Sequence, residues 1–221
     1  MKIIFNKILS EGKNMKLYNE LEQNLVSLAK RENEISTERK ELLIKFAEYI
    51  SQKINNEAVV NLIFICTHNS RRSTMSQIWA KTAAEYFNIP NINCFSGGTE
   101  ATAFNPRAVK TVQNYGFKVE QKDESENPIY LVHFSDGKEP ITCFSKVYND
   151  KFNPQNNFAA IMTCSDADAN CPLVFGAEAR FPVKYNDPKE FDNTNLEIEK
   201  YTERFEQIGI EMLYTFSRIK K

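Results

Sequence analysis

The chain has 221 residues, which is enough for one full α/β domain with a small appendage. Its 28 Lys and Arg residues balance 29 Asp and Glu residues, so it lacks the broad basic field that long nucleic acid or an anionic membrane would select. Hydrophobic residues make up 42% of the chain, and no apolar run approaches the roughly 18 residues of a membrane span. These totals exclude bulk disorder and a transmembrane protein, and they predict a soluble globular unit.

The N-terminus and the cysteine count predict a cytoplasmic protein. Residues 1–5 begin like a signal peptide, but Asn6 and Lys7 interrupt the apolar stretch and no small-residue cleavage site follows. The five cysteines are an odd number in a chain without an export signal, which favours thiol chemistry or simple burial over a disulfide framework. Met15 offers an alternative start, because residues 1–14 show no clear period.

Residues 1–57 are expected to form a helical extension. They contain no Pro and only one Gly, and two apolar stripes at helical spacing predict a pair of amphipathic helices arranged as a hairpin. We expect the pair to pack on the main domain or on a second copy of the chain, with a specific partner-binding role as the alternative. The stripes consist of Leu17, Leu21, Leu25 and Leu28, followed by Leu43, Phe46, Ala47, Ile50 and Ile54.

Residues 58–221 show short apolar runs that alternate with helical stretches, the pattern of parallel strands joined by crossover helices. The sequence therefore predicts an α/β sandwich. A hairpin insertion near 124–157 interrupts this pattern, and its function cannot be inferred from the sequence. The expected strands cover 59–65, 92–96, 117–120, 129–134, 141–145, 158–163 and 180–185, and the expected helices cover 73–87, 106–116 and 196–218.

The segment Cys66-Thr67-His68-Asn69-Ser70-Arg71-Arg72-Ser73 lies between the first expected strand and a helix. A loop that enters a helix N-terminus turns consecutive backbone N–H groups inward, which creates a binding site for a tetrahedral oxyanion. The same field favours the thiolate form of Cys66 and makes it a stronger nucleophile. Arg72 can hold two oxygens of the bound anion with its planar guanidinium, which a Lys cannot do.

A second segment, Cys164-Ser165-Asp166-Ala167-Asp168-Ala169-Asn170-Cys171-Pro172, follows a buried strand. Six residues between the cysteines are too many for the usual zinc knuckle, and no His lies nearby, so a metal is not expected. The intervening residues are small, polar and acidic, which predicts a flexible exposed loop or a short helix where two thiols approach each other and a third. Cys94 and Cys143 lie in apolar strands and are expected to be small core residues.

These segments resemble those of a known family. Residues 59–73 resemble the phosphate loop of the low-molecular-weight protein tyrosine phosphatases and of the arsenate reductases built on the same fold. Residues 164–172 closely resemble the cysteine-pair segment of the thioredoxin-coupled arsenate reductases, and residues 96–100 and 105–108 extend the match. The resemblance implies a three-layer sandwich with a central, mostly parallel sheet, and a reaction without metal or organic cofactor in which thioredoxin is the protein reductant.

The resemblance also implies roles for residues of the first segment. Cys66 is the nucleophile, and Arg72 clamps the oxyanion. Asn69 holds the loop in shape through side-chain hydrogen bonds, and Ser73 donates a hydroxyl hydrogen to the thiolate. Two positions depart from the family, because His68 stands where Gly is usual and Arg71 where Cys is frequent. The other loop residues, Thr67 and Ser70, complete the expected oxyanion-binding loop.

In the reaction of the thioredoxin-coupled arsenate reductases, which this sequence resembles, two further thiols form a redox relay. Cys164 attacks the nucleophile sulfur to release arsenite, and Cys171 resolves the disulfide into a form that thioredoxin reduces. Asp187, in Asn186-Asp187-Pro188, is the general acid that protonates the leaving oxygen. Lys189 and Glu190 follow where phosphatases usually place aromatic residues, which counts mildly against an aryl phosphate.

The expected function is therefore arsenate reduction. A phosphomonoesterase acting through a Cys66 phosphoenzyme is the first alternative, because the same loop and the same acid serve both reactions. A non-catalytic oxyanion-binding adaptor, whose N-terminal helices carry the partner interface or mediate self-association, is the second. The presence of Cys164 and Cys171 favours the reductase, since neither alternative uses them.

Overall fold

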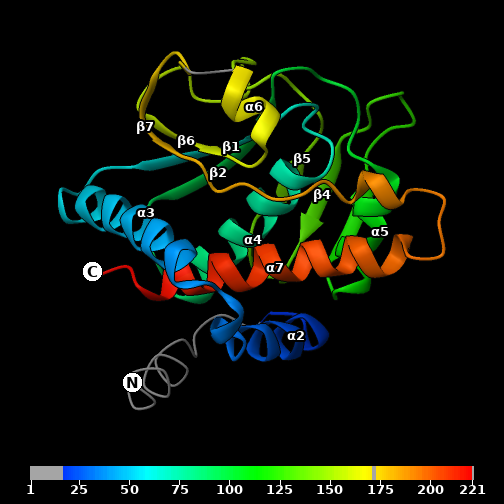
Figure 1. The fold of residues 1–221 in the computed structure, drawn as a ribbon, viewed down its shortest axis with the longest axis horizontal. Coiled ribbons are helices and arrows are strands. Elements are labelled where there is room, and N and C mark those ends of the chain that lie inside the picture. The colour runs from blue at the N-terminus through cyan, green and yellow to red at the C-terminus, as the bar shows by residue number, and fades with distance from the viewer. Residues whose placement is uncertain (1–16, 171–172, 221) are drawn as a thin grey trace.

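The computed structural model describes residues 17–170 and 173–220. Within these residues four strands form a parallel sheet in the order β2-β1-β6-β7 (Figure 1). The N-terminal segment expected to stay uncleaved, and Met15 with it, lies outside the described residues. The strands of this sheet are β1 (Val60–Cys66), β2 (Ile92–Gly98), β6 (Phe158–Met162) and β7 (Ala177–Phe181).

Helices cover both faces of the parallel sheet. Helix α4 packs on β1 and β2 and, on its other side, on α7, while the short α6 covers the opposite face of the sheet. Gly209 lets α7 approach α4 closely, because a Cβ at this position would lie 2.8 Å from the ring of Trp79. The helices are α2 (Asn19–Ala29), α3 (Thr37–Asn55), α4 (Arg72–Tyr86), α5 (Pro106–Asn114), α6 (Ser165–Asn170) and α7 (Glu197–Ser217), with 3₁₀ turns η1 (Glu32–Glu34) and η2 (Pro188–Phe191).

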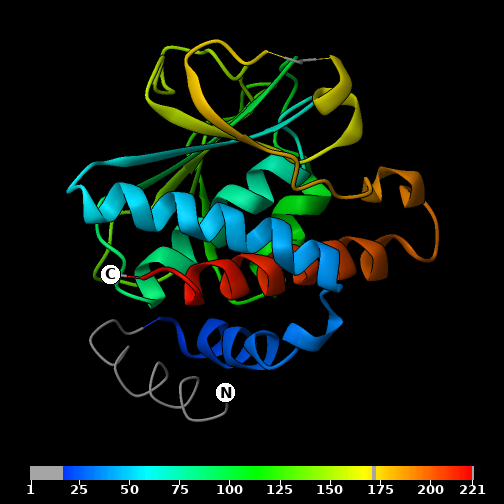
Figure 2. The same ribbon diagram turned by 60° about the vertical axis from the view of Figure 1, so that its left-hand side comes forward.

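Alternate residues of β1 face two apolar clusters, one on each side of the sheet. Leu62 and Phe64 share a cluster with residues of α3 and α4, whereas Ile63 and Ile65 share one with residues around α6. All four side chains are 0% exposed, as expected for a parallel strand covered on both faces. The helix, sheet and helix layers are stacked from top to bottom in Figure 2, which confirms the predicted three-layer α/β fold.

The two predicted N-terminal helices are present as α2 and α3, but the predicted hairpin between them is wrong. Each helix packs on α7 and not along the other (Figures 1 and 2). Leu21 and Leu25 of α2, and Leu43 and Phe46 of α3, are 0% exposed. Both apolar stripes are therefore buried within the chain, because α7 offers each helix an apolar side. No helix among the described residues is long and apolar enough to span a membrane.

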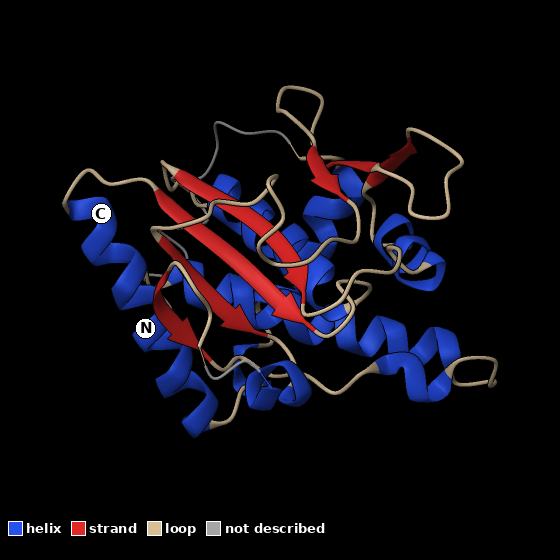
Figure 3. Ribbon diagram, turned by 90° about the horizontal axis from the view of Figure 1, so that it is seen from above, coloured by secondary structure: helices blue, strands red, loops and turns tan. Residues whose placement is uncertain are grey.

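The predicted β-hairpin forms, and a third strand joins it. The strands β3 (Lys118–Gln121), β4 (Tyr130–His133) and β5 (Ile141–Cys143) make an antiparallel sheet in the order β3-β4-β5. Figure 3 shows this small sheet as a group of short arrows apart from the parallel sheet. The strand expected at 117–120 therefore belongs to the hairpin and not to the central sheet.

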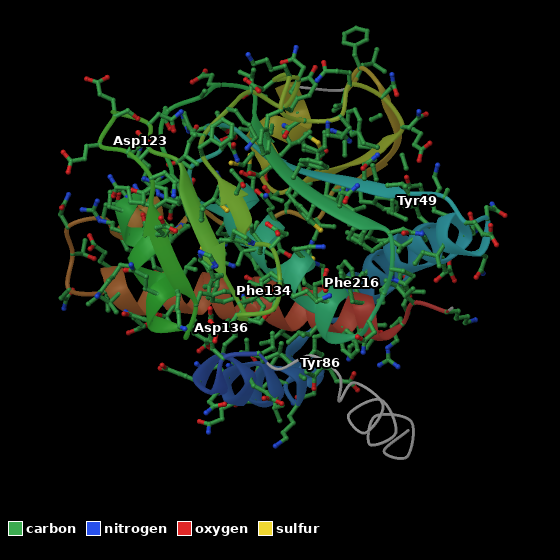
Figure 4. The ribbon with its side chains drawn as sticks, turned by 180° about the vertical axis from the view of Figure 1, so that it is seen from behind. Tyr49, Tyr86, Asp123, Phe134, Asp136 and Phe216 are labelled. Atoms are coloured by element: carbon green, nitrogen blue, oxygen red, sulfur yellow. The ribbon has the colours of Figure 1, made fainter. Side chains whose placement is uncertain are left out.

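The connection after β4 also contacts α2. The backbone N–H of Tyr18 donates to the carbonyl oxygen of Phe134 (3.1 Å), and the Tyr18 hydroxyl donates to Asp136 (2.8 Å). Figure 4 shows the labelled Phe134 and Asp136 above this helix. The small sheet is thus tied to the start of α2.

Strand β7 occupies 177–181, whereas the sequence predicted a strand at 180–185. Pro182 follows β7 and has no N–H to donate, so the ladder with β6 ends there. Beyond it the chain crosses the C-terminal edge of the sheet, where the N–H of Tyr185 donates to the carbonyl oxygen of Thr163 (3.0 Å). This path brings the following residues to the end of β1.

Candidate active site

In the loop between β1 and α4, the backbone carbonyl groups of residues 66–70 all accept hydrogen bonds from residues that surround the loop, so they point away from its centre. Those of Cys66 and Thr67 accept the backbone N–H groups of Thr99 (3.1 Å) and Glu100 (2.8 Å). The next three carbonyls are held in the same way by the residues around the loop. His68 accepts from the Ser145 hydroxyl (2.8 Å), Asn69 from the Thr74 hydroxyl (3.4 Å), and Ser70 from the N–H of Asn105 (2.9 Å).

This arrangement turns the loop N–H groups inward. Every peptide bond here is trans, so a carbonyl held outward directs the N–H of the same peptide to the inside. In the part of the chain that the structure describes, the N–H groups of residues 67–71 have no acceptor. Together with the N-terminus of α4 they form the concave donor site that a tetrahedral oxyanion requires.

Asn69 and Gly98 allow the tight path of the loop. Asn69 has a φ of 46°, in the left-handed region that Asn tolerates better than most residues. Its side chain donates to the Ser73 hydroxyl (2.9 Å) and accepts the backbone N–H of Lys146 (3.0 Å). A Cβ on Gly98 would lie 2.6 Å from the carbonyl oxygen of Thr67, so only glycine lets the end of β2 approach the loop this closely.

Cys66 lies at the end of β1 and is 3% exposed. Its Sγ is 3.1 Å from the Oγ of Ser73. Because that oxygen accepts a hydrogen bond from Asn69, the Ser73 hydroxyl hydrogen is available to the sulfur. Cys66 thus lies at the end of the strand that precedes the N-terminus of α4, with a hydroxyl donor beside its sulfur.

Arg72 and Asp187, both predicted as site residues, are in direct contact. Arg72 donates through Nη2 to Oδ2 of Asp187 (2.6 Å) and through Nη1 to the carbonyl oxygen of Tyr185 (3.1 Å). Its Nε is buried and has no hydrogen-bond partner among the described residues. Asp187 caps η2, because its Oδ1 accepts the N–H of Lys189 (3.1 Å). These bonds use two of the five N–H donors of the Arg72 guanidinium, and the Nε–H is among the three that remain for a ligand.

Arg71 belongs to a network that the sequence did not predict. Its Nε donates to the hydroxyl of Tyr201 (2.8 Å), and that hydroxyl donates to Asp192 (2.8 Å). Burial raises the pKa of Tyr201, so the hydroxyl keeps its hydrogen. The network joins the loop to the start of α7 and to the segment that carries Asp187. No local motif could have revealed it, since Arg71 and Tyr201 are 130 residues apart.

Cys164 lies beside the oxyanion loop, while Cys171 is outside the described residues. Cys164 is 0% exposed and shares an apolar cluster with Cys66. Its Sγ is 3.5 Å from the hydroxyl oxygen of Thr67 and accepts the N–H of Ala167 (3.3 Å). Of the two forms expected for this segment, the structure shows the short helix α6. It buries the first thiol, which the exposed loop would not have done.

The other two described cysteines are core residues, as predicted. Cys94 lies in β2 and is partly buried, and Cys143 lies in β5 and is fully buried. Burial raises the pKa of both thiols to about 12, so neither is a nucleophile near neutral pH. No group of three or more His, Cys, Asp or Glu side chains within the described ranges could hold a metal ion.

A cavity of about 340 Å³ adjoins the loop. Among the described residues its walls are polar or small and include no aromatic ring, so they offer no stacking surface for an aryl ester. This agrees with the presence of Lys189 and Glu190, and not of aromatic residues, directly after Asp187-Pro188. The lining residues are His68, Ser70, Arg71, Thr102, Ala103, Asn105, Pro106 and Lys189.

Sequence and structure comparisons identify relatives of this chain. Curated arsenate reductases from Staphylococcus epidermidis and Staphylococcus aureus are 26% and 28% identical to it over 149 residues, which cover 65% of this chain and 94% of each relative. No protein-family model matches the chain. The crystal structure of a YwlE mutant from Bacillus subtilis is 16% identical, with a TM-score of 0.50 over 73% of this chain and 99% of that chain.

These matches confirm the resemblance inferred from the motifs. The sequence relatives are bacterial arsenate reductases, and the YwlE structure has an α/β fold similar to that of this chain. About a quarter of the chain has no counterpart in the YwlE structure, which covers 73% of it.

Proposed function

We propose that this chain reduces arsenate to arsenite, with Cys66 as the nucleophile, Cys164 and Cys171 as a disulfide relay, and thioredoxin as the reductant. The observation that carries the proposal is the position of two thiols at one loop. Cys66 lies at the base of the inward-facing N–H groups, and Cys164 is buried in the same apolar cluster beside the loop.

In the first step the loop N–H groups and Arg72 bind arsenate. The Cys66 thiolate attacks the arsenic atom, a sulfur–arsenic bond forms, and one arsenic–oxygen bond breaks. The leaving oxygen departs as water after Asp187 protonates it. The arsenic is still As(V) in this adduct.

In the second step the Cys164 thiolate attacks the Sγ of Cys66. A disulfide forms, and the sulfur–arsenic bond breaks with its electron pair left on arsenic, which leaves as arsenite, As(III). The Cys164 sulfur that makes this attack is held in place by the N–H of Ala167 and lies beside the Thr67 hydroxyl.

In the third step the Cys171 thiolate attacks the Sγ of Cys164. The new disulfide joins Cys164 to Cys171 and frees Cys66, and the two thiols of thioredoxin then reduce that disulfide. Such a relay needs a reducing compartment, which supports the cytoplasmic location expected from the sequence.

A phosphomonoesterase is the second candidate. Ester hydrolysis needs a nucleophile, a group that binds the phosphate and a general acid, and Cys66, Arg72 and Asp187 would serve as these three groups. The non-aromatic cavity disfavours aryl phosphates as its substrates. A non-catalytic adaptor is less well supported, because the apolar faces of α2 and α3 are buried within the chain and do not present a partner surface.

The test is arsenate-dependent oxidation of NADPH coupled through thioredoxin and thioredoxin reductase, run beside hydrolysis of a phosphate ester. Phosphoserine is used together with p-nitrophenyl phosphate, because the cavity disfavours aryl esters. The proposal expects arsenate turnover that stops when thioredoxin is omitted. Hydrolysis of either ester without arsenate turnover would favour the phosphatase.

A further inference from the structure

The antiparallel sheet contacts the oxyanion loop through Ser145, which follows β5. The Ser145 hydroxyl donates to the carbonyl oxygen of His68 (2.8 Å) and accepts the backbone N–H of Thr102 (2.7 Å). Ser145 is 2% exposed, so water does not compete for these bonds. The Thr102 hydroxyl gives the same His68 carbonyl a second and longer contact (3.4 Å).

Ser145 is itself fixed on two sides. Asn127, in the connection between β3 and β4, donates to the Ser145 carbonyl oxygen (2.8 Å) and accepts the Ser145 N–H (3.1 Å). The next residue, Lys146, donates its N–H to the side chain of Asn69 (3.0 Å) and accepts the N–H of Gly98 (2.8 Å) at its carbonyl. The small sheet therefore holds Ser145 rigidly against the loop.

The consequence concerns the peptide between His68 and Asn69. Because this peptide is trans, holding the His68 carbonyl outward directs the N–H of Asn69 into the oxyanion site. A hydroxyl is suited to this position, since it donates to one loop and accepts from the segment that carries Thr102. An alanine at position 145 would remove the shorter hydrogen bond to the His68 carbonyl oxygen and the acceptor of the Thr102 N–H.

We propose that Ser145 is a positioning residue for the oxyanion loop, delivered by the antiparallel sheet, and that it acts through the N–H of Asn69. The inference rests on the proposed function only in taking a tetrahedral oxyanion as the ligand of the loop. It assigns a role to the insertion that the sequence left without one.

The experiment measures the Kd of inorganic phosphate by isothermal titration calorimetry on the full chain. Ser145→Ala should raise this Kd roughly tenfold to a hundredfold, the range for losing one hydrogen bond to a charged group. Ser145→Thr keeps the hydroxyl and should recover part of the loss. Arsenate turnover should fall with phosphate affinity in the same order of variants.

Ser51 provides the matched control. Its hydroxyl is also buried, donates to the carbonyl oxygen of Ala47 (2.9 Å) and accepts the N–H of Lys220 (3.0 Å), but it lies in α3 away from the loop. Ser51→Ala therefore removes the same kinds of bond. It should lower the free energy of unfolding about as much as Ser145→Ala and leave the Kd of phosphate unchanged.

Each outcome decides the inference. A Kd in Ser145→Ala equal to that of the wild type and of Ser51→Ala would overturn it and leave the proposed function intact. A wild type that binds neither phosphate nor arsenate would overturn the proposed function and the inference with it. If Ser145→Ala does not fold, Asn127→Ala, which loosens Ser145 from a partly exposed position, decides in its place. A raised Kd there supports the inference, and an unchanged Kd contradicts it.

Discussion

The guanidinium of Arg72 and the carboxylate of Asp187 form an ion pair in which Nη2 and Oδ2 are 2.6 Å apart. The group expected to clamp the oxyanion is thus bound to the group expected to protonate the leaving oxygen. Arg71 approaches the other carboxylate oxygen at 4.0 Å. An oxyanion that binds Arg72 therefore competes with the Asp187 carboxylate for the same guanidinium.

Asp187→Asn should separate the role of Asp187 as general acid from its competition with the oxyanion for Arg72. Turnover should fall by about 100-fold or more, because the general acid is lost. The Kd of phosphate should nevertheless decrease, because a negatively charged competitor for Arg72 is gone. Glu190→Gln removes a negative charge nearby from an exposed position and should alter neither value much. Weaker phosphate binding in Asp187→Asn would show that the ion pair does not compete with the ligand.

Arg72→Lys should lose far more activity than its retained charge suggests. A lysine cannot reproduce a planar two-point contact with an anion whose charge spreads over several oxygens. Losing one such donor typically costs on the order of 100-fold in turnover. Turnover of arsenate near the wild-type value would mean that Arg72 is not the clamp, and Arg71 would be the next residue to test.

Gly98→Ala should damage both stability and binding. The new Cβ would lie 2.2 Å from the carbonyl oxygen of Glu100 and 2.6 Å from that of Thr67, so the backbone on one side of the loop must shift. We expect a loss of about 1–3 kcal/mol in the free energy of unfolding, measured in urea, and weaker phosphate binding. Gly137→Ala is the control, since no atom of residues 17–170 or 173–220 lies within 4 Å of the Cβ that it would add. If the two variants have the same free energy of unfolding and the same Kd of phosphate, the end of β2 does not approach the loop as closely as described.

The buried side chain of Lys146 should make the free energy of unfolding depend on pH. Burial lowers the pKa of Lys146 from its ordinary 10.5 to about 8, with the ammonium 4.1 Å from the ring centre of Phe144. Between these two values the unfolded chain binds a proton that the folded chain has released, so stability rises with pH there. Below pH 8 both states are protonated and this contribution is constant.

The measurement compares wild type with Lys146→Met, which keeps the length of the side chain without the charge. Relative to this variant, the free energy of unfolding of the wild type should increase from pH 8 upward, by about 3 kcal/mol at pH 10.5. A difference that is flat or that falls over this interval would show that Lys146 stays protonated in the folded state.

The sequence predicted the elements whose signals are local. The apolar run of β1, the loop after Cys66 and the helix that begins at Arg72 follow one another, so this strand, loop and helix could be predicted without tertiary information. Asn105 and Pro106 mark the start of α5 equally well, because one caps the helix and the other occupies its first turn. The end of β7 was misplaced, because the apolar pattern continues past Pro182 while the hydrogen-bond ladder cannot.

The remaining features depend on contacts between distant segments. Nothing near Arg71 indicates a bond to Tyr201, and nothing near Ser145 indicates a bond to the loop, since these pairs are brought together only by the packing of α7 and of the antiparallel sheet. The helical period of α2 and α3 predicted an apolar face for each. It could not predict that both faces meet α7, because periodicity does not identify the partner surface.

The disulfides formed by a single exposure to arsenate test the relay most directly. In Cys171→Ser the proposed chemistry should stop as a disulfide between Cys66 and Cys164, detected by peptide mass mapping without added reductant. The wild type, and Cys143→Ser as a control, should instead accumulate a disulfide between Cys164 and Cys171. Recovery of neither disulfide, together with rapid hydrolysis of p-nitrophenyl phosphate, would contradict the reductase and favour the phosphatase.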